Sequence, residues 1–198
     1  MKEDFVLKII NDLKPGGLAL DIGAHYGEYT TILASKFAQV FAFEPLRYNG
    51  AILAENVKDC KNVFIVSKAI SDHNGVTRFW PCSRNDGGGT VNEEVAATGK
   101  YGHELETYAN IKCTTIDNFI GDNSVDFIKM DIEGAEDFVW PSAQETIDIS
   151  PNLKIVLETH KHINGLKLYQ FFIKNGFTIF PDHDTLREDT HYFMEKLK

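Results

Sequence analysis

The chain has 198 residues, of which 43% are hydrophobic and 25% are charged, and its formal net charge is −9. This composition is typical of a soluble globular protein, and the length suits one domain with one core. The acidic surplus disfavours a surface that follows nucleic-acid phosphates or binds anionic membranes. We therefore predict a single domain over residues 1–198, with neither nucleic acid nor a membrane as its partner.

The cysteines and the N-terminus indicate a cytoplasmic location. Cys60, Cys82 and Cys113 are widely spaced and fit neither a disulfide framework nor a CxxC metal site, so we expect reduced thiols. The N-terminal residues contain no apolar stretch of signal-peptide or membrane length. Their apolar residues recur at helical spacing instead, which predicts an amphipathic helix within residues 1–16.

Strands and helices alternate in the first third of the chain. Short apolar runs predict strands at residues 18–22, 40–43 and 63–67. Helical spacing of apolar residues predicts helices over residues 29–37 and 46–57. This β-α-β-α-β order with short links favours parallel strands in an α/β fold.

The middle of the chain has a different composition. A turn signal precedes a predicted strand at residues 76–80, and residues 83–107 are polar and glycine-rich. An insert of that length is usually functional or mobile, so we interpret it as a lid or substrate-recognition segment; a surface loop without function is the alternative. Trp80 and Tyr101 border it and could line an acceptor pocket or belong to the core.

Regular patterns return in the C-terminal half. A helix is predicted directly after Gly134, and another between a capping Asn164 and Gly176. The last two predicted strands are close enough to form an antiparallel hairpin. With the first three, the predicted strands make a seven-stranded, mostly parallel, doubly wound α/β sheet. The four strands of this half are expected at residues 125–131, 153–158, 177–180 and 191–195.

The strand ends carry a candidate nucleoside site. Ligands of open α/β sheets bind at the carboxyl ends of the strands. Asp21 ends the first strand and is followed by Gly23 and Gly27, which permit a tight turn. Glu44 follows Asp21 by 23 residues, near the offset of roughly 20 at which an acidic residue holds a ribose. We therefore expect Glu44 to accept ribose hydroxyls; a solvated strand-end glutamate is the alternative.

The charge of this turn favours one cofactor over another. Its pattern is GxxxG, whereas pyrophosphate-binding turns have GxGxxG. Asp21 and Glu28 flank it, and carboxylates oppose a pyrophosphate but tolerate a sulfonium and an ammonium group. These observations favour S-adenosylmethionine over NAD, and methyl transfer over hydride transfer. An NAD-dependent oxidoreductase and a non-catalytic cofactor-binding module remain the alternatives.

Several motifs also carry a family resemblance. DIGAHYGEYT, FAFEP, KAISDHNG, TTIDNF, DFIKMDIEGAE and IVLET, in this order, resemble the FkbM family of class I S-adenosylmethionine-dependent methyltransferases. The resemblance runs from about Leu18 to Phe177, and DIEGAE is its most specific element. It implies a Rossmann-like methyltransferase fold and methylation of a hydroxyl on a sugar, polyketide or similar small molecule. His25, where the family commonly has asparagine, and VWPSAQ at residues 139–144 depart from the family pattern.

The resemblance also implies cofactor contacts. The first glycine turn would contact the methionine half, and Glu44 the ribose. Ser71 and Asp72, after the third strand, would lie near the adenine. The expected cofactor-binding residues are Asp21, Gly23, Ala24, Gly27, Glu44, Ser71, Asp72 and Asp131.

The candidate catalytic residues follow two later strands. An alcohol must lose its proton during methyl transfer, and histidine can accept one at neutral pH. His160 is the first candidate base, although His162 is equally available. Asp131 and Glu133 are the second candidates, as bases or as groups that orient the methionine amino group, and His103 is a distant third. Glu133 could alternatively serve only the dipole of the following helix.

A metal site is an alternative at the same strand ends. Asp131, Glu158 and His160 could together form an oxygen-rich Mg²⁺ site. The family resemblance does not require a metal, and we predict none.

Overall fold

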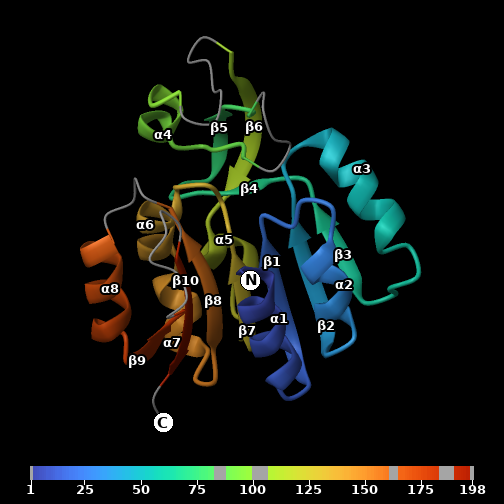
Figure 1. The fold of residues 1–198 in the computed structure, drawn as a ribbon, viewed down its shortest axis with the longest axis vertical. Coiled ribbons are helices and arrows are strands. Elements are labelled where there is room, and N and C mark those ends of the chain that lie inside the picture. Colours follow the sequence, from blue (N-terminus) through green and yellow to red (C-terminus); the bar gives the residue numbers. More distant parts are fainter. Residues whose placement is uncertain (1, 83–87, 100–106, 161–164, 183–189, 197–198) are drawn as a thin grey trace.

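The computed structural model of the protein describes residues 2–82, 88–99, 107–160, 165–182 and 190–196. Its centre is a seven-stranded sheet with the order β3-β2-β1-β7-β8-β10-β9 (Figure 1). The first five strands of this order are parallel, and β10 is antiparallel to both of its neighbours. This confirms the predicted α/β sheet with its C-terminal hairpin. The strands are β1 Gly16–Ile22, β2 Phe37–Phe43, β3 Val63–Val66, β7 Phe127–Met130, β8 Lys154–Thr159, β9 Phe177–Pro181 and β10 Thr190–Lys196.

Helices cover both faces of this sheet because its strands bury apolar side chains on both sides. Val40 and Phe127 pack in one core cluster with α1 and α2, and Ala42 packs against α3. Ile128 and Leu157 point to the other face, where α5, α7 and α8 supply the partners. The helices are α1 Lys2–Asp12, α2 Glu28–Ala34, α3 Arg47–Asn56, α5 Ile116–Ile120, α6 Glu136–Val139, η1 Trp140–Ala143, α7 Gln144–Ile149 and α8 Gly165–Lys174.

A second, smaller sheet and a short helix were not predicted. The strands β4 (Ala69–Ile70), β6 (Ala109–Thr114) and β5 (Gly75–Phe79) form it in the order β4-β6-β5. Figure 1 shows it with α4 (Glu93–Ala97) at one end of the large sheet. The strand predicted at residues 76–80 is therefore β5, outside the large sheet. The insert predicted at residues 83–107 contains α4, whose N-terminus is capped by the Asn92 side chain.

Two element boundaries differ from the prediction. Phe37 was assigned to a helix, but α2 ends at Ala34 and Phe37 begins β2, where its ring stacks on Phe127 with centroids 5.7 Å apart. The helix expected after Gly134 is broken into α6, η1 and α7. Pro141 lies at the start of η1 and has no N–H to continue an α-helix. The VWPSAQ segment is this break.

Helix α8 ends close to the predicted position at Gly176. Gly176 follows the helix with φ +79°, a left-handed conformation that favours glycine. Asn164, the predicted cap of the same helix, lies outside the described residues. Within the described ranges, no helix is both long and apolar enough to cross a membrane.

Candidate active site

A cleft lies at the carboxyl ends of β1, β2 and β7, where the large sheet meets the small one. Its walls include Gly23, Ala24, Glu44, Asp131 and Glu133, all of which the sequence predicted as site residues. The small sheet contributes Ile70 and Phe79 to the opposite wall. The fold thus brings predicted residues from three strand ends to one concave surface, as expected for a parallel α/β sheet.

The turn after β1 requires its two glycines. Gly23 has φ +80°, and a Cβ atom there would overlap the carbonyl oxygen of Asp131. Gly27 has φ +88° and begins α2, and a Cβ atom there would overlap Leu53. His25 is also left-handed, with φ 50°. Histidine, like the asparagine common in the resembled family, is among the few non-glycine residues enriched in that region, which accounts for this departure.

Asp21 is buried beneath the turn and is hydrogen-bonded to the helix that follows it. Its side chain is fully buried, accepts a 2.6 Å hydrogen bond from the Thr30 hydroxyl, and lies 3.9 Å from the Lys129 ammonium group. Burial raises the pKa of Asp21, and the positive charge of Lys129 opposes that rise. Among the described residues, Asp21 and Gly27 are not part of the cleft wall. Their direct contact with a cofactor stays a prediction.

Glu44 is held at the edge of the cleft by main-chain groups. The backbone N–H of His25 donates to one carboxylate oxygen at 3.0 Å, and that of Leu46 donates to the other at 2.9 Å. Burial nevertheless raises the pKa of Glu44 to about 7, and these hydrogen bonds lower it in part. The Asn49 side chain is a third hydrogen-bond partner of this carboxylate. A carboxylate has about four acceptor positions, so Glu44 can still accept a hydroxyl donor. Residues 23–27 together with Glu44 are called the cofactor turn below.

The segment expected near the adenine lies beside the cleft. Ser71 is buried, and its backbone N–H donates to the Thr114 carbonyl oxygen at 3.0 Å. The Asp72 carboxylate is half-exposed and contacts the His73 ring at 2.7 Å. In the described part of the chain, residues 68–70 line the cleft, whereas Ser71 and Asp72 do not. An adenine contact of these two residues also stays a prediction.

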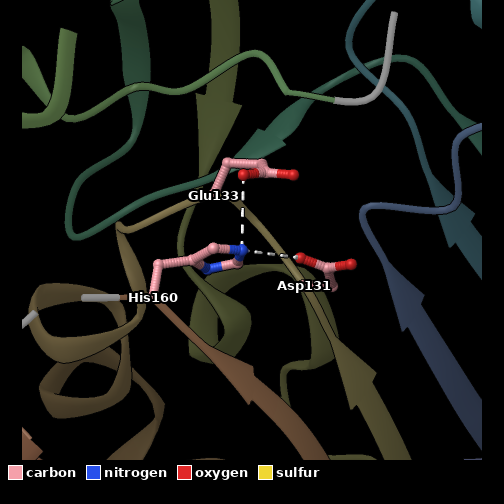
Figure 2. A group of neighbouring side chains, drawn as sticks. All are labelled: Asp131, Glu133 and His160. Carbon is pink, nitrogen blue, oxygen red and sulfur yellow. Dashed lines mark ion pairs between the residues drawn. The ribbon is translucent and has the colours of Figure 1, made fainter. Parts of the chain in front are cut away.

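The three catalytic candidates lie close together (Figure 2). Asp131 and Glu133 line the cleft, and His160 lies beside them but is not among the described residues of the cleft wall. His160 Nε2 lies 3.3 Å from a Glu133 carboxylate oxygen and 3.8 Å from one of Asp131. The other ring nitrogen, Nδ1, is 3.3 Å from Oε1 of the buried Glu136. Glu133 has φ 56°, a left-handed conformation that is strained for glutamate. Asp131, Glu133, Glu136 and His160 are called the acid–histidine cluster below.

The acid–histidine cluster favours a protonated histidine. Burial alone lowers the pKa of His160, but the hydrogen bond with Glu136 and the three carboxylate charges outweigh it and raise that pKa to about 10. Burial raises the pKa of Glu133 to about 8, with a further contribution from the charge of Asp131. The imidazolium is therefore the favoured form of His160 at neutral pH in the unliganded protein.

Two buried charged residues of the site were missed by sequence reasoning. Glu136 Oε1 accepts hydrogen bonds from the backbone N–H groups of Ile132 and Gly134, which shapes the turn after β7. Lys129 donates to the Gly23 carbonyl oxygen at 3.2 Å and lies 3.9 Å from the carboxylate of Asp131. A lysine inside the apolar strand FIKM is the signal that could have revealed it, because an unpaired buried lysine is unfavourable.

The structure groups different residues from those of the alternative Mg²⁺ site, in which Glu158 was a ligand. Glu158 pairs instead with His191, whose Nε2 lies 2.9 Å from the carboxylate. Possible ligand atoms of Asp131, Glu133 and His160 lie within 4.8 Å of one another. A divalent cation there would need a neutral His160. The prediction of no metal stays a prediction.

The remaining candidates divide into two groups. His103, His162 and Tyr101 lie outside the described residues. Trp80 is buried, packs against Tyr108 with ring centroids 6.0 Å apart, and does not line the cleft as described. Its neighbour Phe79 takes the wall position.

Solved structures of methyltransferases share this fold. An rRNA methylase from Streptococcus thermophilus is 11% identical with a TM-score of 0.59, covering 100% of this chain and 95% of that chain. A methyltransferase from Streptococcus mutans, solved in complex with SAH, is 12% identical with a TM-score of 0.55, covering 99% and 97%. The fold is therefore the Rossmann-like fold of S-adenosylmethionine-dependent methyltransferases.

The sequence assigns the family. The profile of the methyltransferase FkbM domain matches residues 21–188, so the chain belongs to this family of S-adenosylmethionine-dependent methyltransferases. This confirms the predicted family and cofactor. A curated relative, the 2-O-methyltransferase NoeI of Sinorhizobium fredii, is 28% identical over 147 residues, covering 68% of this chain. The chain spans 60% of the length of that relative.

Proposed function

We propose that the protein methylates a hydroxyl group of a small molecule such as a sugar. The observation that carries this proposal is the buried His160 facing Asp131 and Glu133 at the edge of the cofactor cleft. A proton acceptor beside the reacting methyl is what an alcohol acceptor requires. The name of the relative, a 2-O-methyltransferase, supports an oxygen acceptor.

The cleft residues suit the charges of the cofactor. Glu44 can accept ribose hydroxyls because the backbone uses only one lone pair of each oxygen. The Asn49 side chain also hydrogen-bonds to this carboxylate, so a second hydroxyl would replace it. Asp131 can orient the cofactor's ammonium group, since its carboxylate lies at the end of β7 and lines the cleft. When bound, the cofactor supplies an electrophilic methyl group on a sulfonium. Holding the acceptor in line with that methyl provides much of the acceleration.

The acid–histidine cluster takes the hydroxyl proton. His160 is protonated in the unliganded protein, because its pKa is about 10. A positive charge entering the cleft disfavours the imidazolium and lowers that pKa, so that Nε2 can accept a proton. If His160 keeps its proton, the Glu133 carboxylate 3.3 Å away is the acceptor.

A turnover assay with matched variants tests this role. The substrates are a library of glycosides and simple alcohols with labelled S-adenosylmethionine, and SAH affinity is measured in parallel. Replacing a general base costs about 10²–10⁴-fold in rate, so we expect His160→Asn to lower kcat by at least about 100-fold with SAH affinity retained. His191→Asn, which removes another buried histidine of a histidine–glutamate pair, is the control.

Two outcomes would contradict the proposal. Equal turnover of the His160→Asn and wild-type proteins would show that His160 is not the general base. Glu133→Gln would then be expected to lose activity. Cofactor binding without methylation of any hydroxyl compound in the library would favour the non-catalytic module.

A further inference from the structure

A second cavity of about 420 Å³ lies between α8 and the large sheet, at the carboxyl end of β8. Leu157, Leu168, Phe172 and Met194 form its apolar walls. Its volume falls within the range of about 300–1,000 Å³ that is typical of small-molecule sites. The cavity is thus large enough for a ligand group and chemically suited to an apolar one.

One end of this cavity reaches His160 of the acid–histidine cluster. His160 lines the cavity together with Thr159, at the end of β8. Its Nε2 lies 3.3 Å from Glu133, and Glu133 lines the cofactor cleft. One imidazole therefore stands between the cofactor cleft and the apolar cavity, so a group seated in the cavity would end beside the catalytic candidates.

The rim of the cavity exposes apolar side chains on α8. Leu166 and Tyr169 line the cavity and are 68% and 51% exposed. They are three residues apart, which places them on one face of the helix. Contiguous apolar exposure of this kind marks a binding surface more often than isolated exposed residues do.

We propose that this cavity holds an alkyl or aryl group of the acceptor, which brings the adjoining hydroxyl to His160. The inference rests on the proposed O-methylation and narrows its substrate class to amphiphilic alcohols, such as glycosides with an apolar aglycone. Among the described residues of the cavity wall there is no Asp, Glu, Lys or Arg, and His160 is the one histidine. A charged substituent would lose its hydration in this cavity and find no oppositely charged side chain on the described wall, which is unfavourable. An apolar group, in contrast, gains free energy from burial.

Binding of three glucosides tests the proposal without requiring turnover. Methyl, octyl and phenyl β-glucoside are titrated by calorimetry into the protein saturated with SAH, with octyl glucoside kept below its micelle-forming concentration. Burial of two methylene groups suffices for about a ten-fold gain in affinity. We therefore expect octyl or phenyl glucoside to bind at least about ten-fold more tightly than methyl glucoside, and their ratio separates an alkyl from an aryl site.

Rim variants localise the binding. The double variant Leu166→Glu/Tyr169→Glu adds charge at the rim and should remove the advantage of the apolar glucosides. Ile173→Glu is the matched control, because Ile173 is 48% exposed on the same helix but is not part of the described cavity wall. All variants should bind SAH with wild-type affinity.

The outcomes separate this inference from the proposed function. Failure of SAH binding to wild-type protein would contradict the proposed function itself. Normal SAH binding with equal or absent binding of the three glucosides would overturn the cavity assignment alone. An apolar preference that the rim variants leave intact, or that Ile173→Glu abolishes equally, would also overturn it.

Discussion

The cofactor turn and the acid–histidine cluster both lie at strand ends and both hold buried carboxylates, but they stabilise them differently. In the cofactor turn, backbone N–H groups of His25 and Leu46 hold Glu44. In the acid–histidine cluster, three carboxylates surround one imidazole. Backbone donors fix a carboxylate in place and favour its ionised form, which suits recognition. Side chains that share protons respond to incoming charge, which suits proton transfer.

Lys129 connects the two regions. Its ammonium group donates to the Gly23 carbonyl oxygen at 3.2 Å and lies 3.9 Å from the carboxylates of both Asp21 and Asp131. One buried cation thus compensates Asp21, which lies beneath the cofactor turn, and Asp131 of the acid–histidine cluster. The difference between the regions can be tested by their separate effects on SAH affinity.

The largest effect is expected for Gly23→Ala. A Cβ atom at this left-handed position would overlap the Asp131 carbonyl oxygen, so the turn must move. We expect SAH binding to be lost and the free energy of unfolding to fall by about 2 kcal/mol or more. Calorimetry and urea denaturation measure both.

Gly50→Ala is the matched control for that variant. Gly50 lies in α3, where a Cβ atom would meet no atom within 4 Å outside the adjoining helix backbone. Alanine should stabilise a helix interior by roughly 0.5–1 kcal/mol relative to glycine. Wild-type SAH affinity in Gly23→Ala would show that the turn does not shape the cofactor site.

The next largest effect is expected for Glu44→Ala. Loss of two charge-assisted hydrogen bonds to the ribose should weaken SAH binding by about 10- to 100-fold, with the fold retained. Isothermal titration calorimetry measures the affinity. Glu55→Ala, which removes an exposed glutamate of α3, is the charge-matched control. An unchanged affinity in Glu44→Ala would refute the ribose assignment.

A smaller effect is expected from pH. The pKa of Glu44 in the unliganded protein is about 7, and its ionised form is the better acceptor for hydroxyl groups. SAH affinity should therefore increase between pH 6 and pH 8, by up to about ten-fold if only the ionised form binds. Affinity titrations across this range should show the increase in wild type and a flatter profile in Glu44→Gln. A profile of the same slope in both proteins would assign the titration to another group.

The smallest effect on SAH affinity is expected for Glu136→Gln. Glu136 belongs to the acid–histidine cluster and is fully buried beside His160. Its replacement should leave SAH affinity within about two-fold, while removal of its charge lowers the pKa of His160 from about 10 toward its ordinary value of 6.5. NMR titration of the imidazole carbon-bound protons measures that pKa. An unshifted His160 pKa would show that Glu136 does not control the charge of the acid–histidine cluster.

Local patterns in the sequence predicted the large sheet and much of the cofactor turn. Apolar runs located all seven strands, and the spacing of Asp21 and Glu44 placed both at neighbouring strand ends. Such local patterns could not predict which strands far apart in the sequence pair with each other. Strand β6 pairs with Ala69–Ile70 on one side and Gly75–Phe79 on the other, both far from it in the sequence. Its residues, ANIKCT, do alternate apolar and polar, which is a strand signal, but that signal does not reveal the partners.

The acid–histidine cluster was predicted only in part for the same reason. His160, Asp131 and Glu133 were proposed from their positions after strands, and the structure brings them together. Glu158 was grouped with them, but the β8–β10 register places it opposite His191, with which it pairs. That register depends on the C-terminal strand and cannot be inferred from the segment around Glu158 alone.

A crystal structure of the protein with SAH bound tests the central claim most directly. We predict SAH in the cleft at the ends of β1, β2 and β7, with both ribose hydroxyls within hydrogen-bonding distance of the Glu44 carboxylate. Density for SAH elsewhere, with the Glu44 carboxylate in contact only with protein groups and solvent, would contradict it.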